Sequence, residues 1–90
     1  MPLLVVLHQV ADYDAWRQVY DQSEPLQTAG GVLEDSVFRM TDDPSHVLVL
    51  RRFASADEAE AFLGSDEYRS AMARAGVKPD TMRVELFEEA

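Results

Sequence analysis

The chain has 90 residues, enough for a single domain spanning residues 1–90, and its apolar fraction of 47% is that of a folded globular protein. It has no cysteine, which excludes disulfides and thiolate chemistry and suits a reducing compartment, so we expect a cytoplasmic protein. The net charge of -9 opposes binding to nucleic acid or anionic membranes, and no stretch approaches the ~20 apolar residues needed to span a bilayer.

The first predicted element is a β-strand over residues 3–10, LLVVLHQV, in which both alternating faces are largely apolar. A strand with one face in water would alternate apolar and polar residues instead, so this strand needs a cover on each side. The two faces divide its residues into Leu3, Val5 and Leu7 on one side, and Leu4, Val6 and His8 on the other.

A helix is predicted to follow, because the Asp12 carboxylate can accept hydrogen bonds from the free amides of a first helical turn. We expect Pro25 to end or bend this helix, and Gly30 and Gly31 to stop whatever continues beyond it. The side chains at helical spacing, which should face the sheet, are Tyr13, Trp16, Val19 and Tyr20.

The second half repeats this order. Strands are predicted over residues 32–40 and 46–53, joined by the turn TDDPS, and the second of them, HVLVLRRF, is again apolar on both faces around residues 47–50. Ser55 and Glu58 have capping-box spacing at the start of a helix, Gly64 breaks it, and Ser65 can cap a continuation that Gly76 closes. Alternation predicts a last strand over residues 81–87.

The order βαββαβ predicts an α+β, ferredoxin-like domain, with a four-stranded antiparallel sheet, both helical segments on one face, and the first and third strands at its centre. We expect Leu4, Val6 and their neighbours on the third strand to lie on the opposite face, where a second copy would cover several hundred Å² of apolar surface. The result would be a homodimeric α+β barrel. The alternative is a twisted sheet partly covered by the C-terminal tail.

The segment VLRRFASADEAEAFLGSDEYRSAM resembles the third-strand and second-helix block of the dimeric α+β barrel superfamily, which includes antibiotic biosynthesis monooxygenases and haem-degrading monooxygenases. HQVADYDAW, FRMTDDPSHVLVLRRF and ARAGV are similar to small, cyclase-type members of this group. Haem-degrading relatives have a histidine ligand where this chain has Met72 and a tryptophan where it has Phe53, so the resemblance implies no haem, and we expect no cofactor. An asparagine of these relatives that faces the cavity falls near His8, which implies a place for His8 in the pocket.

Three residues are candidates for catalysis. His8 shares a face with Leu4 and Val6 and could act as a base, although it could also be a hydrogen-bonded interior histidine that only fixes the strand. Arg51 could hold a carboxylate or an enolate, or else form a salt bridge to Glu34, Asp35 or the partner subunit. Tyr20 could donate its hydroxyl or simply pack in the core. The residues predicted to contact a ligand are Leu4, Val6, Arg39, Phe53, Tyr68 and Met72.

The sequence contains no motif for metal binding, nucleotide binding or serine hydrolysis. The two histidines have no metal-ligand spacing, so we expect no metal, and no nucleotide-binding or serine-hydrolase motif occurs. The sequence favours a small homodimeric barrel that binds an aromatic or polyketide-like molecule in an apolar cavity, as a cofactor-independent monooxygenase or cyclase acting by substrate deprotonation. The alternative function is a non-catalytic dimer with a ligand-binding or stress-related role.

Overall fold

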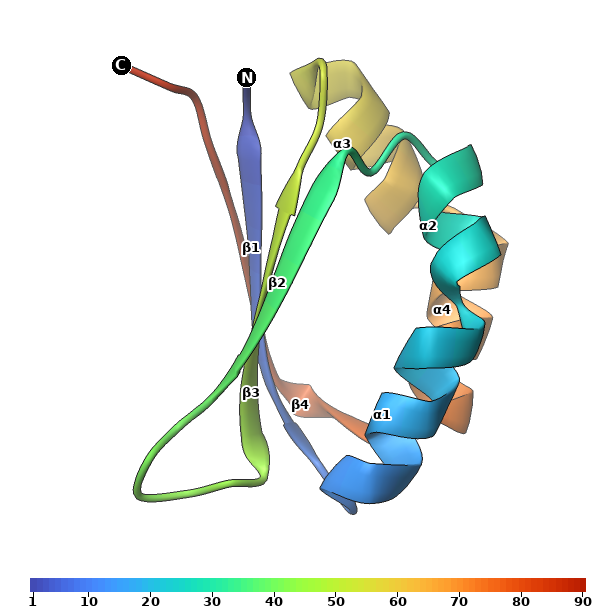
Figure 1. Cartoon of the computed structure of the whole chain (residues 1–90), viewed down its shortest axis with the longest axis vertical. Helices are drawn as coiled ribbons and strands as arrows, with labels where there is room; N and C mark the ends of the chain where they lie inside the picture. The colour runs from blue at the N-terminus through green and yellow to red at the C-terminus, as the bar shows by residue number, and fades with distance from the viewer.

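Four strands form one antiparallel sheet in the computed structural model, which describes residues 1–90 (Figure 1). The strands are β1 (Leu3–Val10), β2 (Glu34–Arg39), β3 (His46–Arg52) and β4 (Val77–Phe87), and their order in the sheet is β2-β3-β1-β4. The predicted ferredoxin-like α+β fold is therefore confirmed, with β1 and β3 at the centre. β4 begins four residues earlier than the alternation predicted.

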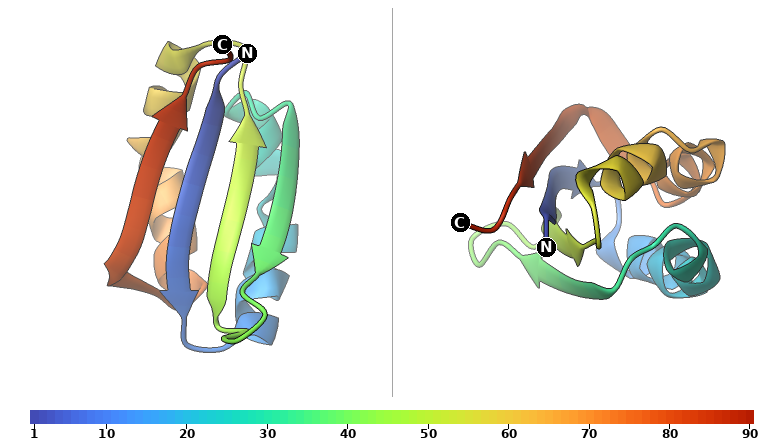
Figure 2. Two further views of the ribbon diagram at one scale, coloured as in Figure 1. Left: turned by 90° about the vertical axis from the view of Figure 1, so that its left-hand side faces the viewer. Right: turned by 90° about the horizontal axis from the view of Figure 1, so that it is seen from above.

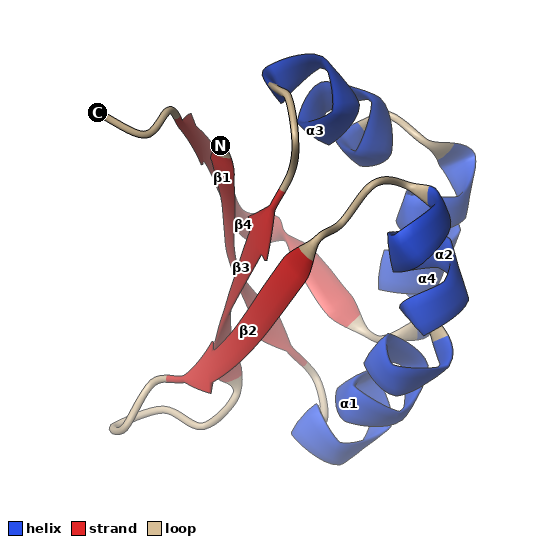
Figure 3. Ribbon diagram, turned by 45° about the horizontal axis from the view of Figure 1, so that its top comes forward, coloured by secondary structure: helices blue, strands red, loops and turns tan.

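All the helices lie on one face of the sheet (Figures 1 and 3). They form two broken columns, α1 (Tyr13–Gln22) with α2 (Glu24–Ala29), and α3 (Ala56–Leu63) with α4 (Asp66–Arg74). Pro25 lies in the first turn of α2, where its missing amide costs no hydrogen bond, and Gly64 follows the last residue of α3. No helix of the chain is both long and apolar enough to cross a membrane.

The predicted helix caps are confirmed. The Asp12 carboxylate accepts hydrogen bonds from the amides of Asp14 and Ala15, at 2.9 and 3.4 Å. The Ser55 hydroxyl oxygen accepts from the Glu58 amide at 3.2 Å, and Ser65 does the same for α4. These contacts satisfy amides that have no partner within the first turn, and so determine where the helices begin.

The two faces of the sheet are the reverse of the predicted assignment. Leu4, Val6 and His8 on β1, with Val47 and Val49 on β3, are buried beneath the helices. The expectation that Leu4 and Val6 face a second copy is therefore wrong. Because both alternations of β1 and β3 are apolar, periodicity could not tell which one the helices cover.

The other face of the sheet has no helix over it, as the left view of Figure 2 shows. Cross-strand pairing places Leu7 beside Leu48, and Leu48 beside Phe38, while Val5 lies beside Leu50. Phe38 is 52% exposed. The C-terminal tail does not cover this centre, since its Glu89 contacts the N-terminal amine and Arg52 at one end of the sheet.

Candidate functional site

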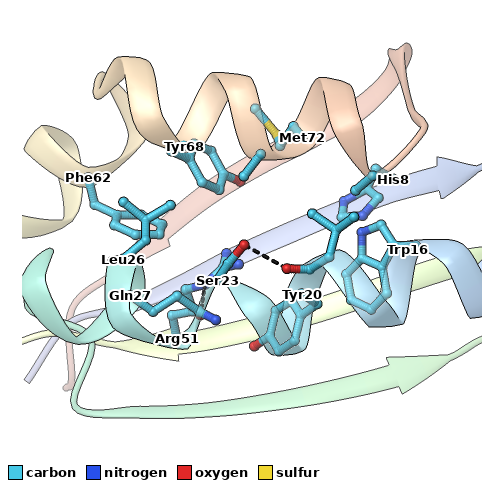
Figure 4. Close-up of a pocket in the computed structure, with 13 residues that line it drawn as sticks. His8, Trp16, Tyr20, Ser23, Leu26, Gln27, Arg51, Phe62, Tyr68 and Met72 are labelled. Atoms are coloured by element: carbon cyan, nitrogen blue, oxygen red, sulfur yellow. Dashed lines mark hydrogen bonds between the residues drawn. The ribbon is translucent and has the colours of Figure 1, made fainter.

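A cavity of about 40 Å³ lies between the helix-covered face of the sheet and the two helical columns (Figure 4). Each wall comes from a different element, so residues far apart in the sequence meet here. The polar and aromatic side chains that line it are His8 from β1, Trp16 and Tyr20 from α1, Gln27 from α2, Arg51 from β3, and Phe62 and Tyr68 from the second column.

His8 occupies an irregular point of the sheet. The pairing of β1 with β4 shifts register between Leu7 and Gln9, and the Gln9 amide donates to Thr81 Oγ1 at 2.9 Å, so His8 has no counterpart on β4. Such irregularities re-aim side chains and are common beside active sites. The His8 side chain is only 3% exposed, and neither ring nitrogen has a hydrogen-bond partner in the protein. The alternative reading, in which His8 is a hydrogen-bonded interior histidine, is therefore not supported, because no protein group pairs with its ring.

The electrostatic surroundings keep His8 neutral. Burial lowers its pKa from 6.5 to about 4, and the positive charge of Arg51 and the proximity of His46 act in the same direction. At neutral pH the imidazole is thus uncharged, and one of its nitrogens is free to accept a proton. Its ring lies 5.8 Å from the Trp16 ring, centroid to centroid.

Arg51 is the buried cation of the cavity. It is 5% exposed, its Nε donates to Gln27 Oε1 at 2.9 Å, and its Nη1 has no partner in the protein. Three aromatic rings surround its Cζ, at 5.2 Å (Phe62), 5.5 Å (Tyr68) and 5.7 Å (Tyr20) from their centroids.

The salt bridge considered for Arg51 within the chain is absent. The adjacent Arg52 points to the other side of the strand and pairs with Glu34 at 3.7 Å, while the Asp35 carboxylate accepts a hydrogen bond from the Tyr20 hydroxyl. Neighbouring residues of a strand face opposite ways, and the acidic partner lies on the side of Arg52.

The two tyrosines differ in the direction of their hydroxyl groups. The Tyr20 hydroxyl is tied to Asp35 on β2, and burial together with this hydrogen bond raises its pKa. The Tyr68 hydroxyl points into the cavity from α4 (Figure 4), and burial raises its pKa although Arg51 opposes the shift. Both phenols are neutral at pH 7, so Tyr68 can donate a hydrogen bond to a bound molecule.

The structure brings together five of the nine predicted site residues, and these line the cavity: His8, Tyr20, Arg51, Tyr68 and Met72. The other four lie elsewhere. Leu4, Val6 and Phe53 are fully buried in a hydrophobic cluster under the helices. Arg39 is exposed, with its guanidinium 3.8 Å from the centroid of the Tyr13 ring.

Of the lining residues that were not among the predicted site residues, Gln27 is the one that contacts Arg51. The predicted helix was expected to end or bend at Pro25, so residues 24–29 had no assigned face. Because α2 continues nearly in line with α1, Gln27 follows Tyr20 by seven residues, a spacing of two helical turns that places both on one side. That spacing was the available signal.

These positions place a neutral base and a buried cation in one largely apolar slot. Such an arrangement can take a proton from a weak acid and stabilise the anion that remains. The sequence model of the family described as "Antibiotic biosynthesis monooxygenase" matches residues 10–74. The chain belongs to this antibiotic biosynthesis monooxygenase family.

Solved structures agree with this family fold. SnoaB, a cofactor-independent oxygenase from Streptomyces nogalater, superimposes with a TM-score of 0.76 and 12% identity, over 99% of this chain and 92% of that one. Rv0793 from Mycobacterium tuberculosis gives a TM-score of 0.71 and 18% identity, over 100% and 96% of the two chains. At these identities the likeness shows the fold of the antibiotic biosynthesis monooxygenase family and nothing finer. A search of curated proteins finds no significant match.

Proposed function

We propose that this family member is a cofactor-independent monooxygenase that binds a small aromatic or polyketide-like weak acid and activates it by deprotonation. One observation carries the proposal. The three buried side-chain nitrogens that lack a hydrogen-bond partner all belong to His8 and Arg51, and both residues line the same cavity. Buried polar atoms are almost always paired in folded proteins, so three such atoms around one cavity support a ligand site.

In the proposed reaction His8 removes the acidic proton of a phenol or β-keto compound. The Nη1 of Arg51 and the Tyr68 hydroxyl stabilise the resulting anion, and the apolar walls strengthen both interactions by excluding water. Carbon of the anion then forms a bond to dioxygen and supplies both bonding electrons. The peroxide so formed takes the proton from His8 and becomes a hydroperoxide. Loss of water, which removes the outer oxygen and the remaining hydrogen of the same carbon, breaks the O–O bond and leaves one oxygen atom in the product as a carbonyl. Dioxygen enters this scheme from the family and from SnoaB, a cofactor-independent oxygenase.

A substrate of this class needs more room than the cavity of about 40 Å³ provides. The half-buried residues of its lining come from both helical columns, and we therefore place the mouth of the cavity between the columns. These residues are Val19, Ser23, Leu26 and Met72. An unbranched thioether such as Met72 adapts its shape readily. We therefore propose that binding separates the columns at this mouth.

We also propose that a second copy covers the bare face of the sheet and completes a dimeric barrel. Leu7, Leu48, Leu50 and Phe38 form the centre of the apolar surface there, and no part of the chain lies over it. A continuous exposed apolar patch of this kind typically marks an interface.

The test of the proposed reaction is oxygen consumption with a panel of hydroxynaphthalenes and cyclic β-keto esters. His8→Ala should reduce turnover by about 100-fold or more, since that is the usual contribution of a general base. His46→Ala, which changes the histidine at the outer end of β3, should retain turnover. Equal turnover in His8→Ala and wild type would refute the role of His8. Binding without turnover in wild type would identify the non-catalytic ligand-binding dimer.

A further inference from the structure

The positive charge of Arg51 forms no ion pair in the folded chain, although Asp35 lies opposite it on β2. None of the five ion pairs includes Arg51, and its Nε donates to the neutral amide of Gln27. The nearby Asp35 carboxylate accepts the Tyr20 hydroxyl instead. Aromatic faces compensate a guanidinium only in part, and a buried charge without an opposite charge is strongly unfavourable.

The free hydrogen-bonding groups beside Arg51 are donors. Nη1 is a donor without an acceptor, and the Tyr68 hydroxyl points into the same space (Figure 4). Neutral His8 contributes one further N–H and one acceptor at the far end of the cavity. A cavity with a buried cation and unpaired donors at one end calls for a negatively charged acceptor there.

The size of the cavity limits what this acceptor can be. About 40 Å³ holds a few non-hydrogen atoms, in a slot walled by Phe62, Trp16 and Met72. The guanidinium fork matches a planar carboxylate, and the acidic outer grooves, which carry Asp66 and Glu67 on one side and Asp21 and Glu24 on the other, disfavour multiply charged anions.

We infer that the resting protein binds a small planar monoanion, a carboxylate of the size of formate or acetate, against Arg51 as its counter-ion. The inference concerns the protein before any turnover and does not depend on the proposed reaction. A larger substrate would displace this anion when its own acidic group reaches Arg51.

The probes are sodium formate, acetate and pivalate, each exchanged for sodium chloride at constant sodium concentration. We expect a saturable rise in melting temperature and a saturable shift of the Arg51 side-chain Nε–H signal in NMR with formate and acetate. Pivalate has the same charge but a bulky tertiary carbon, and should bind at least tenfold more weakly. A response to formate no larger than that to chloride, or equal affinities for formate and pivalate, would overturn the inference.

Two variants test whether Arg51 is the binding group. Arg51→Met removes the charge and the donors. Gln27→Glu keeps the arginine and supplies a carboxylate in the place of the amide that already contacts it. Both should weaken formate binding at least tenfold, and Gln27→Glu should also raise the melting temperature without formate. Arg69→Met, an exposed arginine on α4, should bind formate within twofold of wild type.

If Arg51→Met does not fold, Gln27→Glu still decides the result, because it replaces the missing counter-charge instead of removing the cation. Formate binding of wild-type strength in Gln27→Glu would show that the anion lies elsewhere. These measurements detect anion binding and not turnover. Formate can therefore bind to Arg51 in a protein that consumes no oxygen, and oxygen consumption can occur in a protein that binds no formate.

Discussion

The stability of this protein should depend on pH through His8. Burial lowers the pKa of this residue from 6.5 to about 4, so the unfolded chain binds a proton at a pH where the folded chain does not. With respect to His8, the free energy of unfolding is therefore highest above pH 6.5. It falls as the pH drops from 6.5 to about 4, and the His8 contribution levels off below that.

The size of this effect follows from the shift. A change of one pKa unit corresponds to about 1.4 kcal/mol, so the full loss is about 3 kcal/mol, of which about 2 kcal/mol should be lost between pH 7 and pH 5. For a domain of this size that is a substantial fraction of its total stability. An anion bound to Arg51 would reduce the loss, because Arg51 is the second cause of the lowered pKa.

Urea unfolding at pH 7, 6 and 5 would measure this difference in wild type, His8→Asn and His46→Asn. Asparagine is polar, does not titrate in this range, and is the residue that the resemblance placed near position 8. Carboxylate titration is common to all three proteins and cancels in the comparison. His8→Asn should lose about 2 kcal/mol less than wild type between pH 7 and pH 5, while His46→Asn keeps the His8 contribution. Identical pH slopes in wild type and His8→Asn would show that the His8 pKa is not depressed.

Three further predictions follow from contacts of the fold. Tyr20→Phe removes the hydroxyl that donates to Asp35 and should reduce the free energy of unfolding by about 1 kcal/mol in urea titrations, with an unchanged fold by circular dichroism. Leu4→Ala, at a fully buried position under the helices, should cost about 3 kcal/mol by the same measurement, and a cost below 1 kcal/mol would contradict its place in the core. Leu48→Lys, in the centre of the bare face, should shift sedimentation from the proposed dimer to a monomer of 10.1 kDa, whereas exposed Arg69→Met on the helical side should leave the mass unchanged.

Most of the fold was predictable because local signals agreed with one another. Asp12, Ser55 and Ser65 marked helix starts through their cap chemistry, and the two strands that were apolar on both faces are the two central strands of the sheet. The choice of face was not predictable from alternation. Leu3 and Leu4 are both leucines on opposite faces of β1, and only the packing of the helices determines which of them is buried.

The candidate site was predictable only in part. Alternation along each strand puts His8 on the same face of β1 as Leu4, and Arg51 on the same face of β3 as Val49. Since Leu4 pairs with Arg51 across the two strands, both polar groups lie on one face of the sheet. The prediction that Arg39 contacts a ligand was wrong, because Arg39 lies on the edge strand β2, where its guanidinium stacks on Tyr13 outside the cavity. The Tyr20–Asp35 and Arg51–Gln27 contacts join segments 15 and 24 residues apart, and no local pattern reports pairing at such distances.

The positions of His8 and Arg51 divide the interior of the domain. On β1, His8 stands between Val6 of one hydrophobic cluster and Val10 of the other, and on β3, Arg51 stands between Val49 and Phe53 in the same way. Apolar side chains at these two places would join the clusters into a single core. A chain of 90 residues buries little apolar surface, so a divided core reduces its stability noticeably. The two unpaired nitrogens of His8 and the unpaired Nη1 of Arg51 are unfavourable for stability, and both residues lie on the two central strands. A sequence that keeps them there is therefore better explained by what the cavity binds than by what the fold requires.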